Sequence, residues 1–215
     1  MSPCRESGVF ITIDGPGGSG KSVATANVVA HLNQERIDVV GTAEPSQGVV
    51  GRFIKENLDS LHRDVLACLV AADRIDHIDR VVGPALHLGK VVICDRYIPS
   101  SYVLQTIDGV EQDYVQALNL RIRRPDLAVL LQASPDVSWS RVCRRGAHGR
   151  FEATREQFAS QSAAFAETAR NLRAAGWRTL EISTDARSEQ VAAEIVSAVH
   201  ELRAGHPPAD GELHR

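Results

Sequence analysis

Short apolar runs alternate with longer amphipathic stretches along most of the chain. The apolar runs are rich in β-branched residues, as expected for strands buried on both faces of a sheet; they are Val9–Ile13, Val39–Thr42, Val91–Cys94, Leu127–Leu131 and Thr179–Ile182. Helical spacing of apolar residues predicts helices over Lys21–Gln34, Val50–Asn57, Leu61–Leu88, Glu111–Arg121, Pro135–Arg145, Glu152–Ala175 and Ser188–Arg203. This alternation predicts an α/β fold with a parallel sheet and right-handed crossovers.

Length and composition predict an ordinary globular domain. The chain has 215 residues, of which 43% are hydrophobic, and its net charge of −3 gives no reason to expect nucleic-acid binding. No apolar stretch reaches the roughly 18 residues of a membrane span, and we find no signal peptide. We expect disorder in the polar ends, 1–7 and 205–215, with the folded domain spanning 8–204.

The cysteines suggest a reducing compartment. Cys4, Cys68, Cys94 and Cys143 form no C-x-x-C pair, and two of them lie in apolar runs. We therefore expect reduced thiols and a cytoplasmic protein.

The segment "DGPGGSGKS" (14–22) follows the first predicted strand and opens the first predicted helix. It matches the phosphate-binding pattern G-x-x-x-x-G-K-[ST], in which glycines let successive N–H groups point inward at the start of a helix. We expect Lys21 to reach the β- and γ-phosphates of ATP and Ser22 to hold Mg²⁺. The predicted ATP-binding residues are Gly15, Pro16, Gly17, Gly18, Ser19, Gly20, Lys21 and Ser22.

A second polar segment follows the third predicted strand. In "VVICDRYIPSS" (91–101), Asp95, Arg96 and Tyr97 stand at the carboxyl end of a buried run. Ligands of open α/β sheets bind at this edge, so the three side chains should lie beside the phosphate loop. There Asp95 can bind Mg²⁺ and Arg96 can contact phosphates. The alternative is that Asp95 and Arg96 only cap the next helix.

Two predicted helices carry further charges that could serve a site. Asp73 and Arg74 lie on the long amphipathic stretch, where a solvated ion pair is the simpler interpretation. Arg141, Arg144 and Arg145 share one helix face, ahead of a glycine-bounded break and Arg150. Such a basic segment could be a lid, at about 141–152, that closes over phosphates, or it could be a solvated helix end.

Taken together, these residues resemble the thymidylate kinase family of nucleoside monophosphate kinases. The segments that carry the resemblance are "GPGGSGKS", "TAEP" (42–45), "AADRIDHI…GPALHLGKVVICDRYIPSS" (71–101), "RRPDLAVLL" (123–131) and "RRGAHGRFE" (144–152). The resemblance implies a P-loop NTPase fold, with a five-stranded parallel sheet, helices on both faces and an arginine-rich lid. It also implies a homodimer and Mg²⁺-dependent transfer of the ATP γ-phosphate to a nucleoside 5′-monophosphate.

Roles for single residues follow from the same resemblance. Arg96 would grip the acceptor phosphate, Asp95 would organise Mg²⁺, Arg74 would hydrogen-bond the base, Lys55 would contact the acceptor phosphate, and Ser101 would lie near the base. The phosphate loop has no arginine of its own, which implies that lid arginines supply the catalytic cation, from among Arg144, Arg145 and Arg150. The predicted acceptor-binding residues are Glu44, Pro45, Lys55, Val70, Arg74, Arg96, Tyr97, Ser101, Leu104 and Gln105.

The departures from the family pattern fall mostly on the nucleoside side. Val70 stands where a phenylalanine usually stacks on thymine, Leu104 where a tyrosine lies near the sugar, and Gly17 where many members carry an acid. Ala43 and Gly149 replace a frequent arginine and a frequent aspartate. An aromatic stack on a base is worth about 1–3 kcal/mol. The departures are either neutral variation, with Tyr102, Phe158 or Phe165 filling in, or signs of a different acceptor.

We therefore expect a cytoplasmic, ATP- and Mg²⁺-dependent kinase with dTMP as its acceptor and no nucleic-acid or membrane partner. One alternative is the same reaction on a different or modified nucleotide. Another is a nucleoside kinase, for which Glu44 is the available base. A third is a nucleotide-binding switch without acceptor-dependent turnover.

Overall fold

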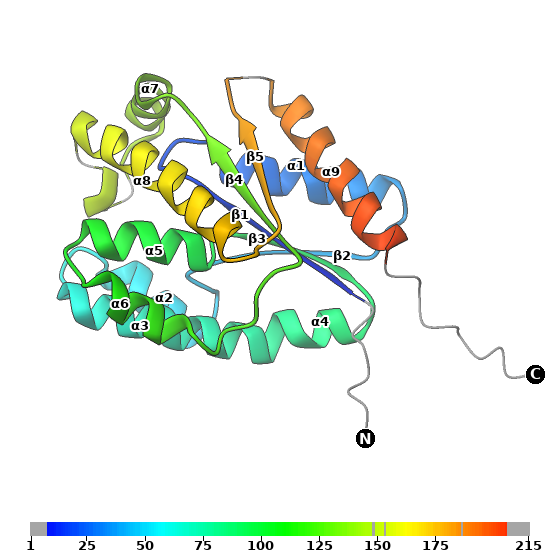
Figure 1. The fold of residues 1–215 in the computed structure, drawn as a ribbon, viewed down its shortest axis with the longest axis horizontal. Helices are drawn as coiled ribbons and strands as arrows, with labels where there is room; N and C mark the ends of the chain where they lie inside the picture. Colours follow the sequence, from blue (N-terminus) through cyan, green and yellow to red (C-terminus); the bar gives the residue numbers. More distant parts are fainter. Residues whose placement is uncertain (1–7, 148, 153, 186, 206–215) are drawn as a thin grey trace, which may run out of the picture.

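The computed structural model describes residues 8–147, 149–152, 154–185 and 187–205. Their strands form one parallel sheet in the order β2-β3-β1-β4-β5 (Figure 1). The strands are β1 (Val9–Asp14), β2 (Val39–Ala43), β3 (Val91–Asp95), β4 (Leu127–Gln132) and β5 (Thr179–Ser183). Each begins at the predicted residue and ends one residue later than predicted, because the pairing register of the strands includes one more residue.

Helices connect the strands and cover both faces of the sheet. They are α1 (Lys21–Gln34), α2 (Val49–Asn57), α3 (Arg63–His77), α4 (Gly83–His87), α5 (Ile98–Ile107), α6 (Gln112–Asn119), α7 (Pro135–Arg145), α8 (Arg155–Ala174) and α9 (Ser188–Ala204), with a π-helical turn η1 (Ile78–Val82) and a 3₁₀ turn η2 (Arg150–Glu152). The predicted α/β fold with a five-stranded parallel sheet and helices on both faces is confirmed.

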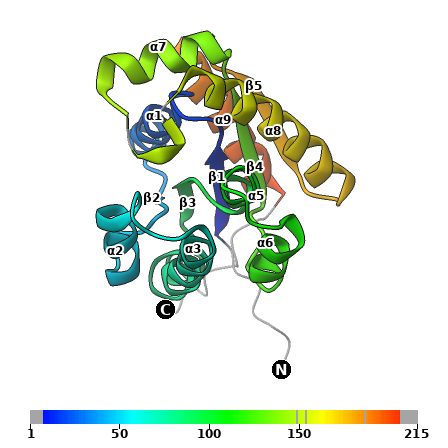
Figure 2. The same cartoon turned by 90° about the vertical axis from the view of Figure 1, so that its left-hand side faces the viewer.

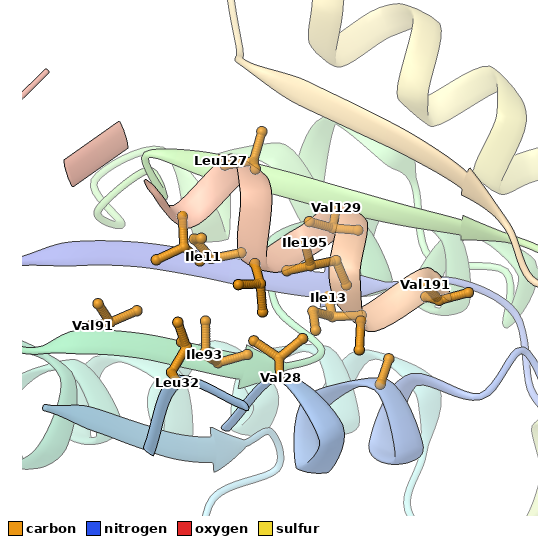
Figure 3. Close-up of a cluster of buried hydrophobic side chains, with 14 of the residues drawn as sticks. Ile11, Ile13, Val28, Leu32, Val91, Ile93, Leu127, Val129, Val191 and Ile195 are labelled. Atoms are coloured by element: carbon orange, nitrogen blue, oxygen red, sulfur yellow. The ribbon is translucent and has the colours of Figure 1, made fainter. Parts of the chain in front are cut away.

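The largest core cluster lies between the sheet and the helices α1 and α9, which run side by side (Figures 1 and 3). It joins strand residues such as Ile13 and Ile93 to Val28 of α1 and Ile195 of α9, and all four are fully buried. On the opposite face, α4, α5 and α8 pack on other side chains of the same strands, including Phe10 and Leu130. The two layers hold the carboxyl ends of β1 and β3 in a fixed position.

The two outer strands differ from the prediction that all strands are buried on both faces. Residues of β1 and β3 are buried throughout, whereas those of β2 and β5 are mostly half-buried or exposed. The reason is their place at the sheet edges, where only one neighbouring strand is present. Apolar composition alone did not distinguish an edge strand from a central one.

Two helical segments also differ from the prediction. The single helix expected over Leu61–Leu88 is interrupted by η1 just before Pro84, whose ring cannot donate a hydrogen bond and clashes with the preceding turn of a straight helix. The helix α5 was not predicted, although Pro99 in its first turn is a typical helix-start signal.

The remaining predictions about the whole chain have mixed outcomes. Cys68, Cys94 and Cys143 are free thiols, while Cys4 lies outside the described residues. Of the ends predicted to be disordered, 1–7 and 205–215, only Gly205 is described, as the C-cap residue of α9. Of the helices in the described ranges, none combines the length and the apolar character that a bilayer crossing needs.

Candidate functional site

The phosphate loop joins β1 to α1 at the carboxyl edge of the sheet, which faces the viewer in Figure 2. Gly15, Gly18 and Gly20 have φ values of 152°, 70° and 91°. These values lie in a backbone region that residues other than glycine rarely adopt. A Cβ on Gly18 would lie 2.4 Å from the carbonyl oxygen of Ser138. No side chain caps the first turn of α1, so its N–H groups remain available to an anion.

Lys21 lies inside this loop and is only 6% exposed. Its Nζ donates to the carbonyl oxygen of Pro16 at 2.7 Å and to Oγ of Ser19 at 3.4 Å. Burial, together with the nearby charge of Arg96, lowers the pKa of Lys21 from 10.5 to about 7. The nearby carboxylates of Asp95, Asp14 and Glu152 act in the opposite direction but do not offset these effects, and a phosphate would add further negative charge beside the ammonium group.

Ser22 and Asp95 meet where the loop approaches the end of β3. The hydroxyl of Ser22 donates to Oδ2 of Asp95 at 2.5 Å. The other carboxylate oxygen, Oδ1, is buried and has no hydrogen-bond partner among the described residues. Hydroxyl and carboxylate oxygens are hard ligands that Mg²⁺ prefers, so this pair fits the metal that the sequence predicts here.

Arg96 follows Asp95 with a left-handed backbone, at φ 72°. This conformation costs a non-glycine residue on the order of 1–3 kcal/mol and is held in part by the hydrogen bond from its N–H to the carbonyl oxygen of Ile13, at 2.9 Å. Its Nη1 is buried and has no partner in the described part of the chain. A strained backbone with an unpartnered guanidinium nitrogen is typical of a residue held for a ligand.

One cavity of about 1090 Å³ connects the phosphate loop to α3 and α5. Of the predicted site residues, those that line it are Gly17, Gly18, Gly20, Lys21, Ser22, Glu44, Pro45, Lys55, Val70, Arg74, Arg96, Tyr97, Leu104, Gln105 and Arg145. The predicted residues outside the lining are Gly15, Pro16, Ser19, Asp95, Ser101, Arg144 and Arg150. The residues predicted for the donor and for the acceptor therefore border the same space.

Arg74 is the centre of a buried polar network at the α3 end of the cavity. Its Nε donates to Oε2 of Glu44 at 2.7 Å, its Nη2 to Oγ of Ser101 at 2.9 Å, and its Nη1 to Oδ1 of Asn119. The guanidinium also lies over the ring of Tyr97, 5.1 Å from the centroid. Arg74 is 1% exposed, so the interpretation of Asp73 and Arg74 as a solvated pair was wrong.

Further polar contacts fix the segment after β2. Oε1 of Glu44 is 3.2 Å from Nδ1 of His77, and the Glu44–Pro45 peptide is cis. The carboxylate of Asp73 accepts both the N–H and the hydroxyl of Ser46, each at 2.6 Å. Lys55 donates to the carbonyl oxygen of Ser46 at 3.0 Å, which leaves its other N–H groups to face the cavity it lines.

Helix α7 presents two of its arginines to the cavity. Arg141 and Arg145, one turn apart, line it, whereas Arg144 does not; both Arg144 and Arg145 are exposed. Arg141 donates to the carbonyl oxygen of Thr184 at 2.9 Å, and Nη2 of Arg145 donates to the carboxylate of Glu152 at 2.6 and 2.8 Å. The predicted helix break is present, since α7 ends at Arg145.

Arg150 has a different environment. Its guanidinium donates to the carbonyl oxygen of Leu61 at 2.7 Å and pairs with Asp108, and its backbone N–H donates to Asp59 at 2.8 Å. These contacts fasten the segment after α7 to the loop between α2 and α3 and to Asp108 at the end of α5. The role of phosphate contact that the sequence predicts for Arg150 and Arg144 stays a prediction.

Several residues of the site were not predicted from the sequence. Glu152 is 5% exposed and occupies the space next to Gly17, where an added Cβ would lie 2.6 Å from its Oε1. Oε1 of Gln161 accepts the N–H of Gly17 at 3.0 Å. His77 and Asn119 were missed as well, because their partners are distant in the sequence. Helical spacing of Arg74 and His77 was the only signal that could have indicated one of them.

The Glu44–Arg74 pair makes a prediction for stability. Arg74→Met should lower the free energy of unfolding by about 3–5 kcal/mol, because it leaves the buried carboxylate of Glu44 short of its main counter-charge. The double variant Glu44→Gln/Arg74→Met should regain part of this loss. Urea denaturation measures both changes. The control Arg80→Met, whose pair with Asp76 is exposed, should leave the denaturation midpoint unchanged; equal losses from both arginines would contradict the prediction.

Comparisons with known proteins agree with this arrangement. The family model for thymidylate kinase matches residues 13–195. A probable thymidylate kinase of Pyrobaculum aerophilum is 38% identical over 146 residues, covering 66% of this chain and 74% of that protein. Thymidylate kinases of Exiguobacterium sp. and Pseudomonas putida are 36% and 34% identical, each over 71% of this chain, and over 76% and 77% of their own lengths. The chain therefore belongs to the thymidylate kinase family and is a nucleoside monophosphate kinase.

Proposed function

We propose that this enzyme transfers the γ-phosphate of ATP to dTMP, giving ADP and dTDP. The observation that carries the proposal is the single cavity that reaches from Lys21 to Arg74, with Arg96 along it. The names of the relatives support dTMP as the acceptor, because those proteins are called thymidylate kinases.

The donor end of the cavity suits a nucleoside triphosphate. The uncapped start of α1 and the ammonium group of Lys21 would bind the β- and γ-phosphates. Ser22 and Asp95 would hold Mg²⁺, directly or through water. The metal, when bound, neutralises part of the phosphate charge.

The acceptor end suits a nucleotide that carries its own phosphate. Arg96 and Lys55 line the cavity as cations and would hold that phosphate. Arg74 would present its remaining N–H groups to the base, in an orientation fixed by Glu44 and Ser101. Gln105 is 5% exposed, and its Oε1 has no partner in the described ranges, so it would serve as an additional contact.

The reaction then needs little covalent chemistry from the protein. An ionised oxygen of the acceptor phosphate bonds to the γ-phosphorus, the bond to the β-phosphate bridging oxygen breaks, and ADP leaves with that electron pair. The nucleophile is already ionised near neutral pH, so no general base is required. Lys21, Arg96 and a lid arginine stabilise the charge of the transition state and align the two phosphates.

Two alternatives from the sequence differ in their support. A nucleoside kinase would use Glu44 as its base, but both oxygens of Glu44 are engaged, by Arg74 and His77. A different nucleotide acceptor keeps the same chemistry, and the aliphatic side chains of Val70 and Leu104 in the cavity lining are the observation that favours testing it.

We also propose a cytoplasmic homodimer. Exposed apolar side chains on neighbouring helices α2 and α3 support a contact with a second copy: Val49 is 73% exposed, Phe53 47% and Ile75 52%. Sedimentation velocity tests the dimer. A monomer at micromolar concentration would contradict it.

The substrate proposal predicts acceptor-dependent ADP release. With ATP, Mg²⁺ and a panel of nucleosides and nucleoside monophosphates, dTMP should give the highest kcat/KM, because the base and phosphate contacts are both made. If dTMP is inert while another monophosphate is turned over, the acceptor is wrong; if no acceptor stimulates ADP release, a nucleotide-binding switch becomes the better account. Arg96→Ala should lower kcat about 10³-fold with whichever acceptor works, and Arg80→Ala, on an exposed surface, should not.

A second prediction concerns the contribution of the lid arginines to kcat. We assign the catalytic cation to Arg145, since it lines the cavity and Arg144 does not. Arg145→Ala should therefore lower kcat about 10³-fold or more, as is typical for an arginine that neutralises transition-state charge. Arg144→Ala is the matched comparison and should cost far less. Steady-state kinetics decide, and a larger loss from Arg144→Ala would reverse the assignment.

The buried Lys21 makes a third prediction, on proton uptake. Its pKa is about 7 without ligand, so near pH 8.5 most molecules carry it neutral, and a bound polyphosphate restores its charge. ADP binding at about pH 8.5 should thus take up close to one proton. The same shift makes the ligand-free protein more stable as pH rises from about 7 toward 10.5, because the unfolded chain still binds this proton and the folded chain does not.

Calorimetry in buffers of different ionisation enthalpy measures the uptake. Lys21→Met is the control and should bind ADP without this proton uptake. Uptake that is equal in the two proteins would show that another group titrates.

A further inference from the structure

Helices α1 and α5 follow the two strands β1 and β3 at the carboxyl edge of the sheet, and their first turns are capped differently. Helix α1 follows the phosphate loop and has no side-chain cap. Helix α5 follows Arg96, and its N-cap residue, Tyr97, makes no capping hydrogen bond of its own. The cap of α5 comes instead from Asp14, the last residue of β1.

A single oxygen of Asp14 accepts three hydrogen bonds from the start of α5. Its Oδ1 is 2.9 Å from the N–H of Tyr97, 3.0 Å from the N–H of Ser100 and 2.6 Å from the hydroxyl of Ser100. The side chain is fully buried. Pro99 has no N–H, so the carboxylate satisfies most of the donors that a helix start leaves open.

The position of Asp14 connects the two halves of the site. Through its backbone it leads directly into Gly15 and the phosphate loop. Through its side chain it holds the start of α5, and the N-cap residue Tyr97 and the helix residues Leu104 and Gln105 line the predicted acceptor part of the cavity. Asp14 therefore links the position of the phosphate loop to the position of the start of α5.

We propose that Asp14 is a positioning residue for the phosphoryl acceptor. By fixing the start of α5, it holds Arg96 and the acceptor-facing side chains of α5 in register with the phosphate loop. Small displacements of such groups are costly, since an error of about 1 Å can lower a rate 10²-fold. The inference rests on the proposed function only for the choice of acceptor.

The test compares Asp14→Ala, Asp14→Asn and Ser100→Ala, with KM for the acceptor and for ATP measured separately. Asp14→Ala should lower kcat/KM for the acceptor about 30- to 100-fold and change KM for ATP less than about 3-fold. Asp14→Asn keeps an acceptor oxygen and should recover to within about 5-fold of the wild type. Ser100→Ala removes one of the three donors and should show a smaller loss with the same acceptor-selective pattern.

Asp126 offers a matched control. Its carboxylate accepts the N–H of Phe10 at 2.7 Å, near the start of β1 and away from the cavity. Asp126→Ala should lower the melting temperature and leave both KM values within about 2-fold of the wild type. A purely structural role for Asp14 would give the same pattern as this control.

The outcomes separate the two proposals. If the wild type phosphorylates a monophosphate but Asp14→Ala and Ser100→Ala leave acceptor KM and kcat unchanged, or raise both KM values equally, the positioning role is wrong. An Asp14→Asn variant as impaired as Asp14→Ala would also contradict it. If Asp14→Ala does not fold, Ser100→Ala and Asp14→Asn still decide. A wild type that phosphorylates no monophosphate would instead overturn the proposed function.

Discussion

The site depends on two cations held close together in a partly buried place. Lys21 is almost fully buried, and the charge of Arg96 helps to lower its pKa to about 7. Arg96 itself has a strained backbone and a guanidinium nitrogen without a partner. In the free protein this arrangement is unfavourable, because burial and repulsion act on the same groups. In the proposed function, bound phosphates would relieve both, and that relief would contribute to binding and to transition-state stabilisation.

In the predicted acceptor half of the cavity, by contrast, the buried cation already has protein partners. There each nitrogen of the buried cation Arg74 donates one hydrogen bond, to Glu44, Ser101 or Asn119, and the guanidinium lies over the ring of Tyr97. A satisfied network of this kind is rigid and offers only a few donors in fixed directions. The predicted donor half therefore offers positive charge to an anion, whereas the predicted acceptor half offers hydrogen-bond donors in fixed directions. Val70 and Leu104 contribute aliphatic side chains to the lining of that half, which also includes the ring of Tyr97.

The sequence predicted most of the fold and the phosphate loop, because both depend on local patterns. Apolar periodicity placed the first residue of every strand, and the glycine spacing placed the loop before α1. Periodicity could not reveal that β2 and β5 are edge strands, which depends on strand order. Nor could it reveal α5, whose start is capped by Asp14, more than eighty residues earlier in the chain. Glu152 beside Gly17 was missed for the same reason, since the contact joins segments far apart in sequence.

The central claim is that two phosphate chains meet end to end in one cavity, between Lys21 and Arg96. A crystal structure with a bisubstrate ligand, in which adenosine and thymidine are joined through five phosphates, tests it most directly. The account predicts that the phosphates contact Lys21 and Arg96 at once, with thymine beside Arg74. A ligand bound with only one nucleoside inside the cavity, or with Lys21 and Arg96 turned toward separate spaces, would contradict it.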